Sequence, residues 1–106
     1  MYQLNHYTTA EGADLFARWL DNLRDKRAKA RIAARLLRLQ NGNFGDCRAV
    51  GEGVWELRID WGPGYRVYYA LTGKRVVLLC EGGDKRTQSA DIERAINRWR
   101  EWQARD

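Results

Sequence analysis

Residues 54–69 constrain the fold more than any other part of the chain, because they read as two alternating strands joined by a Gly-Pro-Gly turn. In the first strand one face carries Trp55, Leu57, Ile59 and Trp61, and the other carries Glu56, Arg58 and Asp60. In the second strand one face carries Tyr65, Val67 and Tyr69, and the other carries Arg66 and Tyr68. Side chains alternate between the two faces of a strand. The pattern therefore predicts an antiparallel hairpin with one face in a core and a charged face that holds Arg58 beside Arg66.

Basic residues gather in one other segment. Residues 24–38 contain seven lysines or arginines and one acid, Asp25, so this segment has a net charge of +6. The whole chain has a net charge of +5, so the other residues sum to −1. Its arginines recur at intervals of three and four residues, at Arg24, Arg27, Arg31, Arg35 and Arg38. On a helix these positions fall within an arc of roughly 80°. The stripe is either an ordinary solvated face or a surface for an anionic partner, and the scarcity of compensating acids favours the second interpretation.

Size and composition predict one domain over residues 1–106. With 44% hydrophobic residues, a chain of 106 residues can form a core without a metal or a disulfide. No apolar run approaches the ~20 residues that cross a bilayer, and no secretory signal is visible, so a cytoplasmic protein is expected. Cys47 and Cys80 could form a disulfide, but two reduced thiols are favoured. His6 is the only histidine, and neither a metal site nor a cofactor is expected.

The periodicity predicts a sheet packed by helices. The expected elements are a strand over 4–7, a helix from Thr8 or Thr9 to about Leu23, a helix over 26–40, strands over 54–60, 65–71 and 75–81, and a helix from Thr87. Residues 44–53 are interpreted as a connection. Short turns make the three later strands an antiparallel meander, and the first two helices should form an antiparallel hairpin. The fold class is α+β, in the order β-α-α-β-β-β-α, with an antiparallel sheet packed against a helical hairpin and a C-terminal helix.

The strand arginines are candidates for binding a phosphate. A guanidinium group is always charged and forms forked hydrogen bonds with phosphate oxygens. The alternative is that Arg58 only pairs with Glu56 or Asp60. Tyr68 shares the face of Arg66 and could stack on a base or transfer a proton.

Residues 82–86, Gly-Gly-Asp-Lys-Arg, add a glycine turn with two cations. Paired glycines allow a ligand to approach the backbone, and Lys85 and Arg86 would lie nearby. The spacing differs from that of a P-loop.

Several segments together resemble the RelE/ParE superfamily of bacterial toxins, and most closely its phage Gp49-like, HigB-type branch of addiction module killer proteins. The matching segments are ELRID (56–60), GYRVYY (64–69), LL (78–79), GDK (83–85) and GNFGD (42–46). The likeness spans nearly the whole chain.

This resemblance implies the toxin of a type II toxin–antitoxin pair. RelE-like members cut messenger RNA in the ribosomal A site without a metal, by attack of a ribose 2′-hydroxyl on the adjacent phosphate. By resemblance, Arg66 would contact the scissile phosphate, and Arg58 with Lys85 or Arg86 would supply further cations. The general base remains open among Lys85, Tyr68 and Glu56, because Glu56 and Ile92 stand where RelE has a lysine and a tyrosine.

The resemblance also implies partners. These would be messenger RNA, the ribosome and a small antitoxin that covers the cationic surface and supplies operator recognition, typically by a helix-turn-helix. A ParE-like member that poisons DNA gyrase without cutting RNA is the alternative, and a member that only binds its antitoxin is a third possibility.

Overall fold

The computed structural model describes residues 1–105 and has a five-stranded sheet at its centre, with the strand order β1-β5-β4-β3-β2. Its elements are β1 (Gln3–His6), α1 (Leu15–Asn22), α2 (Lys26–Gln40), β2 (Cys47–Gly51), β3 (Val54–Ile59), β4 (Tyr65–Thr72), β5 (Val76–Asp84), a 3₁₀ turn (Lys85–Thr87) and α3 (Gln88–Gln103). The predicted α+β class and the meander β3–β4–β5 are confirmed. The sheet is not wholly antiparallel, because β1 pairs in parallel with β5.

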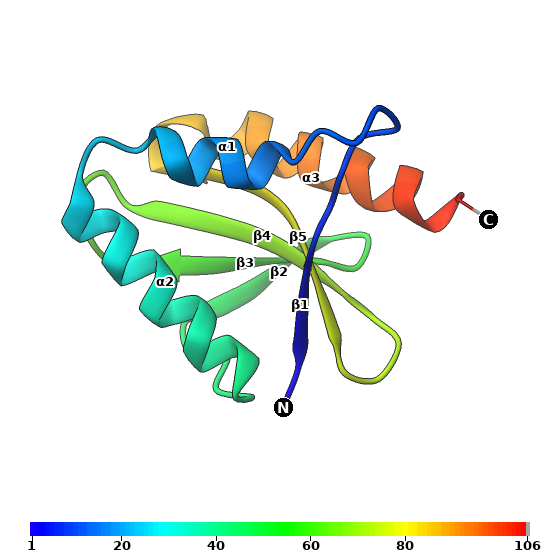
Figure 1. Ribbon diagram of the computed structural model, residues 1–106, viewed down its shortest axis with the longest axis horizontal. Coiled ribbons are helices and arrows are strands. Elements are labelled where there is room, and N and C mark those ends of the chain that lie inside the picture. Colours follow the sequence, from blue (N-terminus) through cyan, green and yellow to red (C-terminus); the bar gives the residue numbers. More distant parts are fainter. Residues whose placement is uncertain (106) are drawn as a thin grey trace.

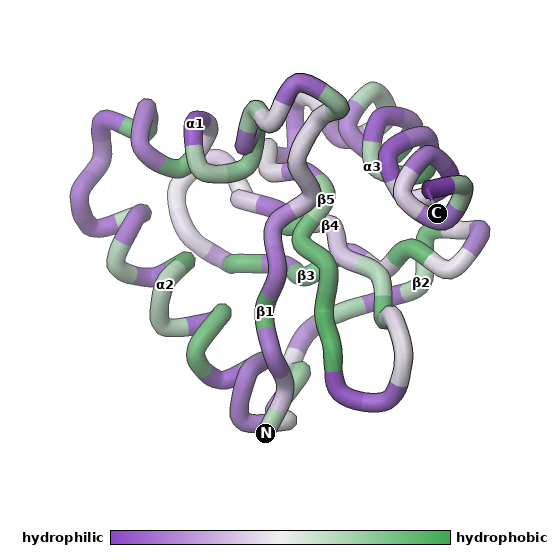
Figure 2. Tube along the Cα trace, turned by 45° about the vertical axis from the view of Figure 1, so that its right-hand side comes forward, coloured by the Kyte–Doolittle hydropathy of each residue, from purple (hydrophilic) through white to green (hydrophobic). Residues whose placement is uncertain are grey.

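Helices cover both faces of the sheet, and alternation along the strands divides the core in two. Leu57, Val67 and Leu79 belong to a cluster with residues of α1 and α2. Tyr68 and Leu78 belong to a second cluster, with residues of α3. In Figure 1 α2 lies at the left of the sheet, away from α3, and α1 is seen in front of α3. Figure 2 shows apolar segments along β3 and β5, and alternating polar and apolar segments along α2.

The second helix has the predicted bounds, and the first begins later than predicted. Asp14, rather than Thr8 or Thr9, caps α1 by accepting a hydrogen bond from the backbone N–H of Ala17 at 2.9 Å. The Thr9 hydroxyl instead accepts from Ala13 N–H at 3.0 Å and closes a turn. The two helices diverge from their short connection (Figure 1), so the expected hairpin opens into a wide V.

The connection predicted over 44–53 contains a strand that the sequence did not indicate. β2 lies at the edge of the sheet and pairs with β3, with an irregularity between Ala49 and Gly51. This irregularity and the glycines hide the period of two that identifies a strand.

Two side chains of the strand predicted over 54–60 lie in environments opposite to those expected. Trp55 is 36% exposed, and Glu56, expected on the exposed charged face, is fully buried. Glu56 lies under Tyr68 and Gln88, the first residue of α3, because α3 covers this part of the face. Cys47 and Cys80 are free thiols. Within residues 1–105, no helix has the length and apolar composition needed to cross a membrane.

Candidate functional site

Arg58 and Arg66 are direct cross-strand neighbours in the β3–β4 ladder. The tight turn over 60–64 joins their strands, with Gly62 and Gly64 at φ values of 54° and 79° that favour glycine. A Cβ on Gly64 would lie 3.2 Å from Nη1 of Arg66, so the bare backbone leaves room for that guanidinium. The pairing predicted from alternation is therefore present.

A cleft of about 380 Å³ lies beside this pair, and we call it the turn cleft. Its lining residues are Asp46, Arg58, Asp60, Gly62, Pro63, Gly64, Arg66 and Lys85. Lys85 is exposed in the 3₁₀ turn that follows β5. Three predicted cations, Arg58, Arg66 and Lys85, thus line one concave surface, although they come from different parts of the sequence.

A buried carboxylate organises the arginines. Oε1 of Glu56 accepts hydrogen bonds from Nε of Arg48 at 3.1 Å and from Nε of Arg58 at 3.2 Å. Nε of Arg66 lies 3.8 Å from the same oxygen, beyond hydrogen-bond range, and has no hydrogen-bond partner within residues 1–105. We call Arg48, Arg58 and Arg66 the arginine cluster. Three guanidinium groups around one carboxylate leave a local charge of +2.

The other oxygen of Glu56 is also occupied. Oε2 accepts hydrogen bonds from the Tyr68 hydroxyl at 3.0 Å and from Nε2 of Gln88 at 2.7 Å. Burial by itself raises the pKa of Glu56, but hydrogen bonds from Gln88, Tyr68, Arg58 and Arg48 outweigh it and hold the pKa below its ordinary value. Glu56 is therefore an ionised carboxylate whose two oxygens are both bound by the protein.

Tyr68 lies in the core and not at the cleft. Its side chain is fully buried in the cluster under α3, so the stacking on a base suggested by the sequence is not open to it. Burial, together with the negative charge of Glu56, raises the pKa of its hydroxyl, which stays protonated and donates to Glu56.

Tyr68→Phe should therefore act on stability. The change removes one of two hydrogen bonds to Oε2 of Glu56, and we expect the free energy of unfolding to fall by about 1 kcal/mol. Urea denaturation followed by circular dichroism measures this. An unchanged midpoint would contradict the hydrogen bond.

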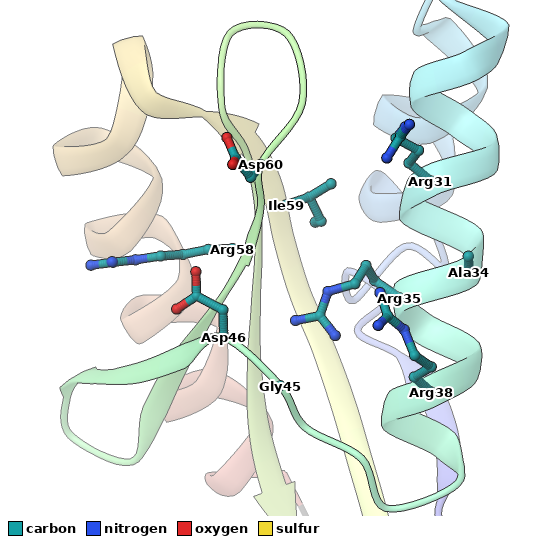
Figure 3. A pocket seen from close by; sticks show the side chains of 9 residues that line it. All are labelled: Arg31, Ala34, Arg35, Arg38, Gly45, Asp46, Arg58, Ile59 and Asp60. Atoms are coloured by element: carbon teal, nitrogen blue, oxygen red, sulfur yellow. The ribbon is translucent and has the colours of Figure 1, made fainter.

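The arginine stripe of α2 faces a second cleft, also of about 380 Å³, which shares Asp46, Arg58 and Asp60 with the turn cleft. Figure 3 shows that the Arg58 side chain points away from α2, while Arg35 extends from α2 toward the loop at Gly45. The Arg58 side chain thus points away from the stripe, although Arg58 lines both clefts.

The members of the stripe differ in exposure. Arg27, Arg31 and Arg38 are exposed on α2, and Arg24 is exposed in the connection before it. Arg35 is only 8% exposed and donates to the Phe44 carbonyl at 3.3 Å. On a helical wheel Arg35 is the member of the stripe nearest the buried residue Ala28, about 20° away. Burial and the nearby charge of Arg38 lower the pKa of Arg35.

Other predicted groups are engaged by the protein. The Arg31 guanidinium lies 4.0 Å from the ring centre of Trp61. Arg86 is exposed and pairs with Asp84, Nη2 to Oδ2 at 2.9 Å. His6 bonds Asp14, Nδ1 to Oδ2 at 2.7 Å, and so anchors the start of α1.

The paired glycines of β5 make room for side chains and not for a ligand. A Cβ on Gly82 would overlap the ring of Trp19 from α1, and a Cβ on Gly83 would overlap the carboxylate of Asp91 from α3. Both glycines are buried in an extended strand. The ligand approach predicted for this turn is corrected to close packing of helices on both faces.

Sequence reasoning missed Arg48, Gln88, Asp46 and Asp60. Arg48 belongs to the unrecognised strand β2 and is the register partner of Glu56. Asp46 and Asp60 line both clefts. Glu56 lies between Arg48 and Arg58, and an acid in this position indicates a basic partner on the next strand. The indication could be used only if β2 had been recognised as a strand. Within residues 1–105, no group of three or more histidine, cysteine, aspartate or glutamate side chains is placed to hold a metal ion.

Comparison with known proteins matches the sequence of this chain to a family. Residues 18–100 match the family model described as phage-derived protein Gp49-like. An uncharacterized protein of Haemophilus influenzae is 57% identical over 81 residues, which cover 76% of this chain and 81% of that protein.

Proposed function

The chain belongs to the Gp49-like family of phage-derived proteins, which is associated with the toxins of toxin–antitoxin modules, and we propose that it is a toxin that cuts messenger RNA. In this proposal it is a RelE-like, HigB-type endoribonuclease that acts on the ribosome and needs no metal. The observation that carries the proposal is the set of three cations, Arg58, Arg66 and Lys85, that line one cleft of about 380 Å³.

The proposed reaction is an internal transfer at phosphorus. The ribose 2′-oxygen forms a bond to the adjacent phosphorus, and the bond from phosphorus to the 5′-oxygen breaks, which leaves a cyclic phosphate and a 5′-hydroxyl. Negative charge builds on the phosphate oxygens as the fifth bond forms. Arg66 and Arg58 would stabilise that charge by forked hydrogen bonds.

Proton transfer would use residues that the cleft exposes. Lys85, as an ammonium group, could protonate the departing 5′-oxygen. Asp46 and Asp60, two exposed carboxylates on the same cleft, are the candidates to accept the 2′-hydroxyl proton. Tyr68 and Glu56 are buried and bonded to each other, so we do not assign the base to either.

The proposed partners follow from the same surfaces. Messenger RNA would occupy the turn cleft, and the exposed arginines of α2 would meet ribosomal RNA or an acidic face of the antitoxin. Action on translating ribosomes would take place in the cytoplasm. The antitoxin would cover part of Arg24, Arg27, Arg31, Arg38 or the turn cleft.

A second candidate is a ParE-like toxin that poisons DNA gyrase without cutting RNA. The burial of Glu56 and Tyr68 favours it, because the cleft then holds fewer groups for acid–base catalysis.

Growth and RNA assays separate these candidates. Expression of the chain should arrest growth unless its proposed antitoxin is expressed with it, and primer extension on a translated message should show cuts in register with codons. Intact message together with trapped gyrase–DNA complexes would select the gyrase alternative. Unimpaired growth without the antitoxin would contradict both.

A further inference from the structure

We infer that Glu56 is a positioning residue that aims the arginine cluster at a phosphate, and that Arg48 is the third arginine of this anion site. This inference rests on the proposed function for the identity of the ligand. The geometry on which it stands is independent of that function.

Cross-strand register brings Glu56 and the arginine cluster together. Glu56 in β3 is the partner of Arg48 in β2 on one side and of Tyr68 in β4 on the other. Arg58 lies two residues along the same face, and Arg66 is its partner in β4. Backbone pairing therefore fixes the position of Arg48 in the site, as it fixes that of Arg58.

The contacts leave the outer ends of the arginines available. Arg48 and Arg58 each use Nε to bond Oε1 of Glu56. Within residues 1–105 neither of them forms a hydrogen bond from its Nη groups. The Nη groups are the pair that grips a phosphate in a forked arrangement. The side chains of Arg48 and Arg58 are 51% and 36% exposed, so an anion can reach both.

A buried carboxylate is what makes this grouping possible. Three guanidinium groups this close repel one another, and a side chain as long as arginine has many rotamers. Glu56, fully buried and held by Gln88 and Tyr68, gives Arg48 and Arg58 one common anchor. The anchor fixes their orientation before the ligand arrives, which lowers the entropic cost of binding.

We expect Glu56→Gln to change the affinity for RNA in the direction opposite to the one that net charge alone would give. Glu56→Gln adds one positive charge, so long-range attraction alone would tighten binding of RNA. Loss of the anchor should instead weaken it, by about fivefold or more. A general base at Glu56 would give a third pattern, with cleavage lost and binding kept or tightened.

The test measures binding of a short single-stranded RNA with 2′-O-methyl groups, which cannot be cut by 2′-hydroxyl attack, by fluorescence anisotropy. The matched control is Glu52→Gln, an exposed glutamate beyond β2 that pairs with Arg100 and brings the same change in net charge. We expect weaker binding for Glu56→Gln and equal or slightly tighter binding for Glu52→Gln. Equal or tighter binding by Glu56→Gln would overturn the inference.

A double-mutant cycle separates positioning from general damage to the fold. In a background of Arg48→Ala and Arg58→Ala, Glu56→Gln should no longer weaken binding and should behave like the charge control Glu52→Gln. A persistent loss there would mean that Glu56 acts through the fold. Arg48→Lys, at a half-exposed position, keeps the charge but loses the Nε contact and should also weaken binding, whereas Arg75→Lys in the distant β4–β5 turn should not.

Side-chain NMR makes the outcome independent of the ligand. Nε–H signals of Arg48 and Arg58 should be resolved and protected from exchange in the wild type, and should merge with those of exposed arginines in Glu56→Gln. Signals that stay resolved in the variant would overturn the positioning role. Protected signals in a wild type that fails to bind RNA would reject the proposed function and keep Glu56 as the anchor.

Discussion

Arg66→Ala should abolish growth arrest and slow cleavage of messenger RNA by about 100-fold or more, the usual loss when one donor to a developing anionic charge is removed. Arg66 is the least exposed member of the arginine cluster. Its side chain is 12% exposed, and its Nε has no hydrogen-bond partner within residues 1–105. Nη1 donates to the Tyr65 carbonyl at 3.2 Å, which holds the group at the rim of the turn cleft. We therefore expect this residue to be the most sensitive to truncation.

The control for Arg66→Ala is Arg75→Ala, which removes the same charge from an exposed turn remote from the clefts. Both variants should keep the wild-type circular dichroism spectrum and bind the antitoxin. Toxicity should vanish for the first and persist for the second. Full toxicity of a folded Arg66→Ala protein would remove the turn cleft from the mechanism.

Gly82→Ala should be strongly destabilising, lowering the free energy of unfolding by about 2–3 kcal/mol. The added methyl carbon would lie 2.1–2.4 Å from three atoms of the Trp19 ring, so the ring or the helix α1 that carries it would have to shift. Because Gly82 has ordinary extended backbone, the effect would come from packing alone. Thermal and urea denaturation measure it.

Gly73→Ala provides the contrast for Gly82→Ala. Gly73 lies in the β4–β5 turn with open space around it and a φ of 67°. An alanine there suffers only the left-handed backbone, which costs about 1–2 kcal/mol. If Gly73→Ala proved the more damaging of the two, the close contact between Trp19 and β5 would be refuted.

The parts of the fold that the sequence predicted are those with a strong period. α2 was predicted with its observed bounds because Ala28, Ile32, Leu36 and Leu39 mark one face and Asn41-Gly42-Asn43 is a stop signal. The meander followed from alternation and short turns. β2 was missed because its pattern is broken, and the start of α1 was misplaced because a threonine hydroxyl closed a local turn.

The candidate site was predictable only in part, because a period of two says which residues share a face and not what covers that face. Arg58 and Arg66 were paired correctly from alternation. Glu56 and Tyr68 share that face, yet α3 covers them and leaves the arginines at its margin. Arg48 needed the position of an unrecognised strand, which only tertiary structure supplies.

The parallel pairing of β1 with β5 has a consequence for synthesis on the ribosome. Residues 3–6 remain without a strand partner until residues 76–79 have left the exit tunnel, and Lys85 and Gln88 follow later still. A nascent chain therefore holds an unfinished sheet and an incomplete turn cleft until these residues have emerged. The polypeptide that we propose attacks translation would become competent only after residues 76–88 have left the ribosome that makes it.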